Sequence, residues 1–303
     1  MKYSFIVSKE EEQERIDKCI CEHNEDLSRS YVQRLIEEGA VLYNGNPVKA
    51  NRRVSADDEI VIDIPDNKTP DILPEDIPLS ILYEDSDLIV IDKPKGMVVH
   101  PANGHYSGTL VNALLYHCKD LSGINGVMRP GIVHRIDRNT TGSVIACKND
   151  LAHNEIAKQL KDHTMNRHYL ALVHGEIKEE NGVVDAPIGR SERDRKKMAV
   201  NFKNGKPART NYTVVKRYQG YTLVDCKLDT GRTHQIRVHM ASIHHPVVGD
   251  DVYTSLKPPC KLEGQALHAY LLGFKHPRTG EYIEVRSELP AYFSDLLGRL
   301  KPL

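Results

Sequence analysis

The hydrophobic pattern of the first 65 residues predicts two helices followed by a small sheet. In the second helix, Val32, Leu35 and Ile36 recur at helical spacing, so their side chains share one face. The segment Ser28-Arg29-Ser30 supplies candidate N-cap hydroxyls for this helix, and Gly39 is a C-terminal stop.

Alternating strand patterns follow this helix. A first strand is broken at Asn44-Gly45, a dipeptide typical of two-residue hairpin turns, and residues 59–64 alternate as a further strand. Four prolines among acidic residues then indicate a semi-extended linker. We therefore expect an α/β domain at residues 1–65, a linker at 66–78 and a second domain at 79–303.

The rest of the chain mixes strands and helices without regular alternation. Strand patterns flank a turn at residues 85–87 and recur at residues 167–177 and 221–228. Asp150 is the expected cap of one helix and Thr233 of another, and both precede residues at helical spacing. An α+β fold with a mixed, largely antiparallel central sheet and flanking helices fits this pattern better than a doubly wound fold.

Composition is typical of a soluble globular protein. The 303 residues are 40% hydrophobic and 27% charged, and no apolar run approaches the roughly 20 residues that span a bilayer. The first residues lack a signal-peptide pattern, so we expect a cytoplasmic protein. The six cysteines and fifteen histidines lack metal-site spacing, and neither GxGxxG after a strand nor a P-loop occurs. We expect no metal and no nucleotide cofactor.

Net charge is only −1, but the charges are unevenly distributed. The acidic first domain contains a basic patch with five cations, namely Arg29, Arg34, Lys49, Arg52 and Arg53. Between residues 190 and 209 there are eight cations and two acids, and the candidates for phosphate contact there are Arg195, Lys196 and Lys197. A solvated loop is the alternative interpretation of this second cluster.

The segment GIVHRIDRNTTG, residues 131–142, carries the strongest chemical signal. Asp137 lies among cations and hydroxyl groups, which favour an ionised carboxylate. Such a carboxylate can anchor a loop, bind a cation or attack a carbon atom.

This segment resembles the central motif of the RluA/RluD family of pseudouridine synthases, with Ile136 in place of the usual leucine. Further stretches resemble family motifs in family order: IDKPKGMVVHP from Ile91, NRHYLALVHGEI from Asn166, TGRTHQIRVHM from Thr230, HPVVGDDVY from His245 and LHAYLLGFKHP from Leu267. The resemblance covers essentially the whole second domain. Residues 1–65 resemble the S4-like RNA-binding domain that many of these enzymes carry.

The resemblance implies that Asp137 is the catalytic carboxylate in the conversion of uridine in RNA to pseudouridine. Whether Asp137 attacks the sugar, attacks the base or removes a sugar proton stays open. A glycoside hydrolase would need two carboxylates, and this motif offers one. The resemblance makes Arg237 the partner that keeps Asp137 charged and aimed. It makes Tyr169 the residue that stacks on the flipped uracil and whose hydroxyl helps take the proton from carbon 5.

Several neighbours are candidates for RNA contact. Arg135 can brace the gap left by a flipped base, and His134 can shape the loop. Arg232 and His234, at the start of a helix, can meet a phosphate. Residues 93–96 are expected to form a rigid turn that supports the site.

We expect an RNA pseudouridine synthase that acts on large-subunit ribosomal RNA without cofactor or metal. Transfer RNA is the alternative substrate, and an RNA-binding ribosome assembly factor without catalysis is the alternative class. The expected partner is RNA. We expect a monomer with no obligate protein partner and no membrane association.

Overall fold

The structure is a computed structural model that describes residues 2–24, 27, 29–64, 72–101, 106–124, 129–194 and 197–303. The expected cap Ser28, residues 66–71 of the expected linker, and the candidates Arg195 and Lys196 lie outside the described residues. The chain divides into two compact units, residues 1–69 and 70–303.

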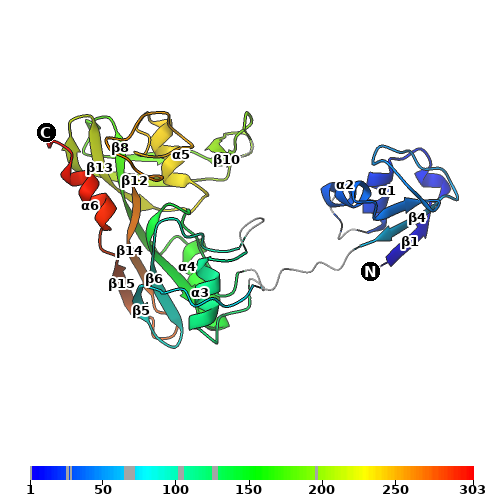
Figure 1. Cartoon of the computed structure of the whole chain (residues 1–303), viewed down its shortest axis with the longest axis horizontal. Coiled ribbons are helices and arrows are strands. Elements are labelled where there is room, and N and C mark those ends of the chain that lie inside the picture. Colours follow the sequence, from blue (N-terminus) through cyan, green and yellow to red (C-terminus); the bar gives the residue numbers. More distant parts are fainter. Residues whose placement is uncertain are drawn as a thin grey trace. The chain divides into compact units, whose positions relative to one another are not determined.

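The first unit packs two helices on one face of a small antiparallel sheet (Figure 1). Its elements are β1 (Lys2–Ile6), the 3-10 helix η1 (Lys9–Glu11), α1 (Ile16–His23), α2 (Arg29–Glu37), β2 (Val41–Tyr43), β3 (Asn46–Pro47) and β4 (Glu59–Asp63). The strand order is β1-β4-β2-β3. Strand β1, which we did not expect, is an edge strand that pairs only with β4, and its Ile6 remains exposed.

Both local signals in this unit are confirmed. The amide of Ala40 donates to the carbonyl of Leu35, and Gly39 has a φ of +75°, which is the Schellman end of a helix. Asn44 and Gly45 have φ values of +48° and +77°, as a type I′ hairpin turn requires.

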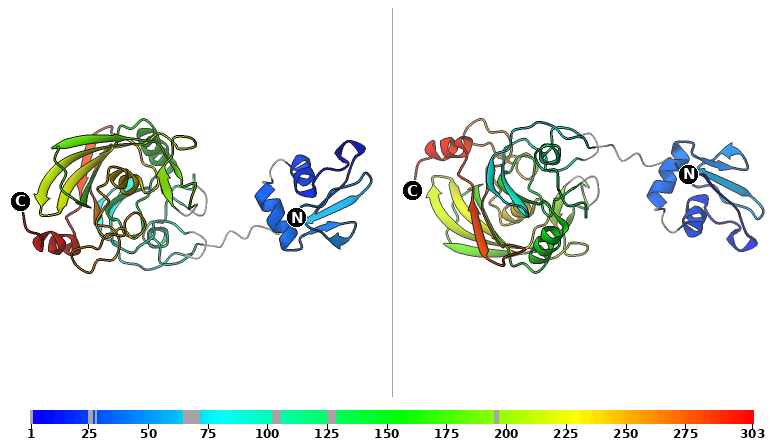
Figure 2. Two further views of the ribbon diagram at one scale, coloured as in Figure 1. Left: turned by 90° about the horizontal axis from the view of Figure 1, so that it is seen from above. Right: turned by 90° about the horizontal axis from the view of Figure 1, so that it is seen from below.

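The second unit is built on a nine-stranded sheet flanked by helices (Figures 1 and 2). Its elements are β5 (Ile81–Glu84), β6 (Leu88–Lys93), α3 (Leu110–His117), β7 (Thr141–Cys147), α4 (Asp150–Lys161), β8 (Asn166–His174), β9 (Asn181–Asp185), β10 (Ile188–Arg190), β11 (Met198–Val200), β12 (Arg209–Tyr218), β13 (Tyr221–Leu228), α5 (Gln235–Ser242), β14 (Leu267–Lys275), β15 (Tyr282–Arg286) and α6 (Ala291–Gly298). The order is β5-β6-β7-β14-β8-β13-β12-β9, with β15 against β14, while β10 and β11 form a separate hairpin. Every pairing within the large sheet is antiparallel except β7 with β14. The expected α+β class is confirmed.

Both faces of the central strands are covered, because successive side chains of a strand point to opposite faces. In β7, Val144 and Ala146 pack in the cluster that contains α3 and α5, whereas Ile145 and Cys147 pack in the cluster that contains α4. Helix α6, in red in Figure 2, buries Phe293 against β8 and β13. The cluster with α3 and α5 borders the cavity described below.

Close contact between β7 and β14 requires a glycine. Gly142 has a φ of +108°, and a Cβ atom there would lie 2.2 Å from the carbonyl oxygen of Ala269. Only a residue without a side chain therefore lets the loop that precedes β7 lie against β14.

Two expected helix caps are wrong, and so is part of the expected linker. Helix α4 is capped by Asn149, whose side chain accepts from the amide of Ala152 at 3.0 Å. Helix α5 begins after His234, a left-handed residue, so Thr233 is not its cap. Residues 72–78 belong to the second unit, where Ile72 is buried in the main core and the carbonyl of Leu73 accepts from the side chain of Asn112.

Candidate active site

Asp137 lies in the loop before β7, at the wall of a cavity of about 660 Å³. The loop is held by Lys93 at the end of β6. The buried ammonium of Lys93 donates to the carbonyls of Pro94, Met97 and Arg138 at 2.8, 2.9 and 3.0 Å. The residues 93–96 that we expected as a supporting turn thus contact the residue next to Asp137.

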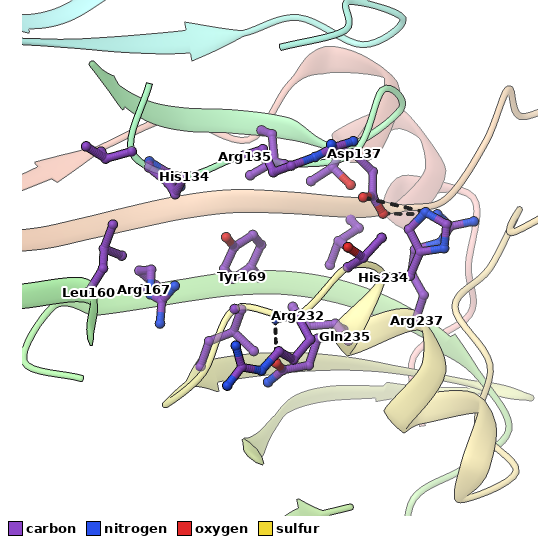
Figure 3. Close-up of a pocket in the computed structure, with 18 of the residues that line it drawn as sticks. His134, Arg135, Asp137, Leu160, Arg167, Tyr169, Arg232, His234, Gln235 and Arg237 are labelled. Atoms are coloured by element: carbon purple, nitrogen blue, oxygen red, sulfur yellow. Dashed lines mark hydrogen bonds and ion pairs between the residues drawn. The ribbon is translucent and has the colours of Figure 1, made fainter. Parts of the chain in front are cut away.

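Arg237, the third residue of α5, meets Asp137 across 100 positions of sequence (Figure 3). Its Nη1 donates to Oδ2 of Asp137 at 3.0 Å. Both residues line the cavity, and the Asp137 side chain, 18% exposed against 5% for Arg237, is the more accessible of the two. The structure therefore brings together the acid and the arginine that the family resemblance implied.

Asp250 anchors this arginine, and sequence reasoning assigned it no role. Its carboxylate, fully buried, accepts from Nε and Nη2 of Arg237 at 2.6 and 2.8 Å. Burial acts against the charge of Arg237, but the hydrogen bonds and charge of Asp250, followed by those of Asp137, raise the pKa of Arg237 above its usual value. A guanidinium held along its Nε–Nη2 edge by two hydrogen bonds to Asp250 presents Nη1 to Asp137 in one orientation.

Tyr169 extends from β8 into the same cavity and is 7% exposed. Burial raises the pKa of Tyr169; the charge of Arg167 lowers it and that of Asp137 raises it. The phenol therefore keeps its proton at neutral pH. Figure 3 shows its ring between Arg167 on one side and Asp137 with Arg237 on the other.

His234 lies beside Asp137 and is held by Tyr253, a residue that sequence reasoning missed. Its Nδ1 hydrogen-bonds the Tyr253 hydroxyl at 2.7 Å, and its Nε2 lies 3.8 Å from Oδ1 of Asp137. The amide of Met198 donates to the same hydroxyl, which leaves the phenol proton for Nδ1 and a hydrogen on Nε2 facing the carboxylate. Burial lowers the pKa of His234, although the charge of Asp137 opposes this shift.

His134 and Arg135 occupy the opposite wall. Nε2 of His134 accepts from the amide of Ile145 at 3.1 Å, and burial lowers the pKa of His134 to about 3. His134 is therefore a neutral side chain that holds the loop to β7. Arg135 is exposed, and its Nη1 lies 3.0 Å from Nε2 of His100 at the cavity rim.

Basic residues surround the cavity mouth. Arg232 is half-buried and donates from Nε to the carbonyl of Pro207 at 3.0 Å. The hairpin β10–β11 packs on α5 through Ile188 and Val238. Lys197 is exposed on this hairpin, and its ammonium donates to the carbonyl of Val252 at 3.0 Å. The hairpin therefore places charge next to the site.

The five cations of the predicted basic patch in the first unit are all exposed. Arg29 makes hydrogen bonds to a buried residue of the same unit, because it and Arg15 both bind the carboxylate of Asp17. Arg34 pairs with Glu38 at 3.7 Å, and Arg52 lies over the ring of Tyr43. Lys49 extends from the loop after β3, and Arg53 donates to the carbonyl of Gln13.

The charged side chains that line the cavity are mainly cationic. Among its described lining residues Asp137 is the only carboxylate, while six are arginine or lysine: Arg129, Arg135, Lys161, Arg167, Arg232 and Arg237. The two flanking carboxylates of a glycoside hydrolase are not found among them. An acceptor-rich, anionic molecule such as RNA matches this lining.

Three groups of side chains elsewhere could each offer three ligand atoms to a metal ion: Glu11 with Cys19 and His23, Glu84 with His117 and Cys118, and Asp85 with Asp87 and His276. None of these residues lines the cavity. In the first group His23 is bonded to Glu11, and in the last Asp87 is bound on both oxygens by Arg278.

Comparison with known sequences places the chain in a family. The pattern of the RNA pseudouridylate synthase family matches residues 87–242, and the S4 domain pattern matches residues 14–60. The chain belongs to the RNA pseudouridine synthase family and carries an S4 RNA-binding domain. No described helix is long and apolar enough to cross a membrane.

Individual relatives agree over nearly the whole chain. It is 50% identical to an uncharacterized RNA pseudouridine synthase of Bacillus subtilis, over 98% of this chain and 97% of that one. It is 44% identical to the ribosomal large subunit pseudouridine synthase D of Zymomonas mobilis, over 91% and 90%. The solved structure of human RNA pseudouridylate synthase domain containing 1 superposes with a TM-score of 0.60 at 26% identity, covering 75% of this chain and 89% of that one.

Proposed function

We propose that this enzyme converts uridine to pseudouridine in large-subunit ribosomal RNA. The observation that carries the proposal is the Asp137–Arg237 pair, which presents one oriented carboxylate to a cationic cavity. The substrate follows from relatives named ribosomal large subunit pseudouridine synthase D at 40 to 44% identity.

Asp137 is the catalytic group. The bond between N1 of uracil and C1′ of ribose breaks, the base turns over without leaving, and a bond from C5 to C1′ replaces it. The proton of C5 leaves and N1 gains one, so the reaction needs no redox partner. One carboxylate that stays in the site serves each possible route, by attack on sugar or base or by removal of a sugar proton.

Tyr169 and Arg135 assist this reaction in different ways. The Tyr169 ring stacks on the flipped uracil, and its hydroxyl, protonated because burial raises its pKa, passes its own proton to water as it takes up the proton from C5. Arg135, exposed at the rim, braces the stack that the base has left. His134 keeps the loop in place.

Several side chains bind the RNA backbone. On the second unit these are Arg232, His234 through its ring hydrogen, and the sequence cluster of Arg195, Lys196 and Lys197. On the S4 unit they are Arg29, Arg34, Lys49, Arg52 and Arg53, which recruit RNA through charge. In this proposal the chain acts as a cytoplasmic monomer.

The decisive experiment maps pseudouridine in ribosomal and transfer RNA from cells that lack the protein. Wild type and Asp137→Asn are returned separately, with Asp251→Asn, an exposed aspartate outside the cavity, as matched control. We expect ribosomal sites to disappear and to return with wild type and Asp251→Asn only. Sites lost from transfer RNA would redirect the substrate. Restoration by Asp137→Asn would refute catalysis and favour an assembly factor.

A further inference from the structure

Arg167 lines the cavity on the side of Tyr169 away from Asp137 (Figure 3). The two residues are two positions apart in β8, so their side chains leave the same face of the sheet. Arg167 is 6% exposed. The guanidinium has room because residue 231 is glycine, where a Cβ atom would lie 2.7 Å from Nη1 of Arg167.

This buried guanidinium has no acidic partner among the described residues. Its one hydrogen bond runs from Nη2 to the carbonyl of Asp229 at 3.4 Å, and its buried Nε has no acceptor. The carboxylate of Asp229 is taken by Arg209 at 3.3 Å and Asn211 at 3.1 Å. Arg237 in the same cavity differs sharply, because two carboxylates bind it.

A structural role accounts poorly for Arg167. Burying a charged group without a counter-charge is destabilising, so proteins pair such groups or use them to bind ligands. Burial lowers the pKa of Arg167. The charges of Tyr169 and Asp229 raise this pKa in part, and the charge of Arg232 lowers it. The site therefore keeps a charge that the free protein does not neutralise.

The neighbours of Arg167 offer donors rather than acceptors. Nε2 of His134 is occupied by the amide of Ile145, which puts the ring hydrogen of the neutral imidazole on Nδ1. Lys161 and Arg232 also line the cavity. The complementary ligand has negative charge and several acceptor oxygens.

We propose that Arg167 binds the phosphate next to the target uridine, so that the RNA backbone is fixed while the base turns over between Tyr169 and Asp137. This inference rests on the proposed function. A cavity of about 660 Å³ holds more than one flipped base, which leaves space for adjoining backbone. The planar fork of arginine matches two phosphate oxygens, whereas lysine offers only a point charge.

The test measures RNA binding in the Asp137→Asn background, where turnover plays no part. Arg167→Met and Arg167→Lys are titrated with in vitro transcribed large-subunit ribosomal RNA and with transfer RNA over a range of salt. Arg286→Met is the matched control, because it removes an exposed arginine of β15 that pairs with Glu284 outside the cavity. Thermal melting of each variant is recorded in parallel.

We expect Arg167→Met to bind about 10-fold more weakly or worse. Its salt dependence should fall by about one phosphate contact. Its melting temperature should equal or exceed that of the parent, since an uncompensated buried charge is removed. Arg167→Lys should keep the salt dependence and lose affinity, and Arg286→Met should match the parent.

Unchanged affinity and salt dependence in Arg167→Met would overturn the proposal, as would a lower melting temperature with binding intact, which is the mark of a structural arginine. Failure of the proposed function gives a different result, because wild type would then make no pseudouridine in either RNA. The binding titrations would still compare the RNA affinity of the Arg167 parent with that of Arg167→Met. Methylphosphonates placed singly beside the mapped uridine refine the assignment. One position should weaken the parent but not Arg167→Met, and equal losses at every position would exclude the phosphate.

Discussion

A substitution at Asp250 can displace Arg237 without changing Asp137, the proposed catalytic carboxylate. Replacement by alanine removes two hydrogen bonds, of 2.6 and 2.8 Å, from a guanidinium that is 5% exposed. Breaking a buried ion pair costs about 3 to 5 kcal/mol. Because Asp137 still binds Nη1 at 3.0 Å, we expect the lower end, about 3 kcal/mol. A unit of this size shifts by about 2 to 4 °C for each kcal/mol, which predicts a melting temperature lower by about 6 to 12 °C.

The catalytic consequence should exceed the structural one. With Asp250 absent, the guanidinium is free to rotate, and a displacement near 1 Å at a reacting group costs about 100-fold in rate. At temperatures below the melting transition, we therefore expect the single-turnover rate of Asp250→Ala to be about 100-fold lower than that of wild type. Its affinity for RNA should be unchanged. Arg237→Lys should fold and lose most turnover, because lysine cannot bond both carboxylates in one plane.

Asp251→Asn is the matched control, since this neighbour is exposed and should behave as wild type. A wild-type rate in Asp250→Ala would refute the idea that Asp250 aims Arg237. An unchanged melting temperature would refute the energetic argument independently of catalysis.

Three other substitutions test the site and its supports. Tyr169→Phe should bind RNA normally but turn over about 100-fold or more slowly, because the ring stays and the proton relay is lost. Lys93→Met should change how stability depends on pH. Burial lowers the pKa of Lys93 to about 7, whereas lysine in an unfolded chain has a pKa of about 10.4. Between these two pH values the unfolded wild type binds more protons than the folded wild type, so wild-type stability rises with pH. The difference in melting temperature, wild type minus Lys93→Met, should therefore increase from about pH 7 to about pH 9.5. Gly142→Ala should lose about 2 to 6 kcal/mol in denaturant unfolding, since it combines a strained φ with a clash against Ala269.

Each of these has a contrary outcome. Full activity in Tyr169→Phe would leave stacking as its only role, and Tyr116→Phe, exposed on α3, shows the effect of a hydroxyl elsewhere. If the difference in melting temperature between wild type and Lys93→Met is the same at both pH values, the pKa of Lys93 is not lowered in the folded protein. For Gly142→Ala the comparison is Gly298→Ala, where a Cβ atom meets open space and stability should not fall.

Local interactions were readable from the sequence. The turn at Asn44-Gly45 and the helix end at Gly39 depend on backbone conformations that few residues adopt, so a dipeptide or one glycine specifies them. The helix that follows Thr233 and contains Arg237 was predicted from residues at helical spacing, although its cap is His234 rather than Thr233. Helix α3 escaped prediction although Thr109 caps it, because its apolar residues spread around the helix as its burial on several sides requires.

Contacts between distant segments were decided by the tertiary structure. Asp250 lies thirteen residues from Arg237 and Lys93 lies 45 from Arg138, and nothing in the spacing of either pair marks it as bonded. The sequence by itself determined the family, the candidate for the catalytic aspartate and the S4 unit, since these are written in contiguous motifs. Only the fold showed that Asp250 binds the arginine, that His134 is a neutral brace and that Arg167 lies buried without an acid among the described residues, because burial and partnership are properties of packed segments rather than of neighbouring residues.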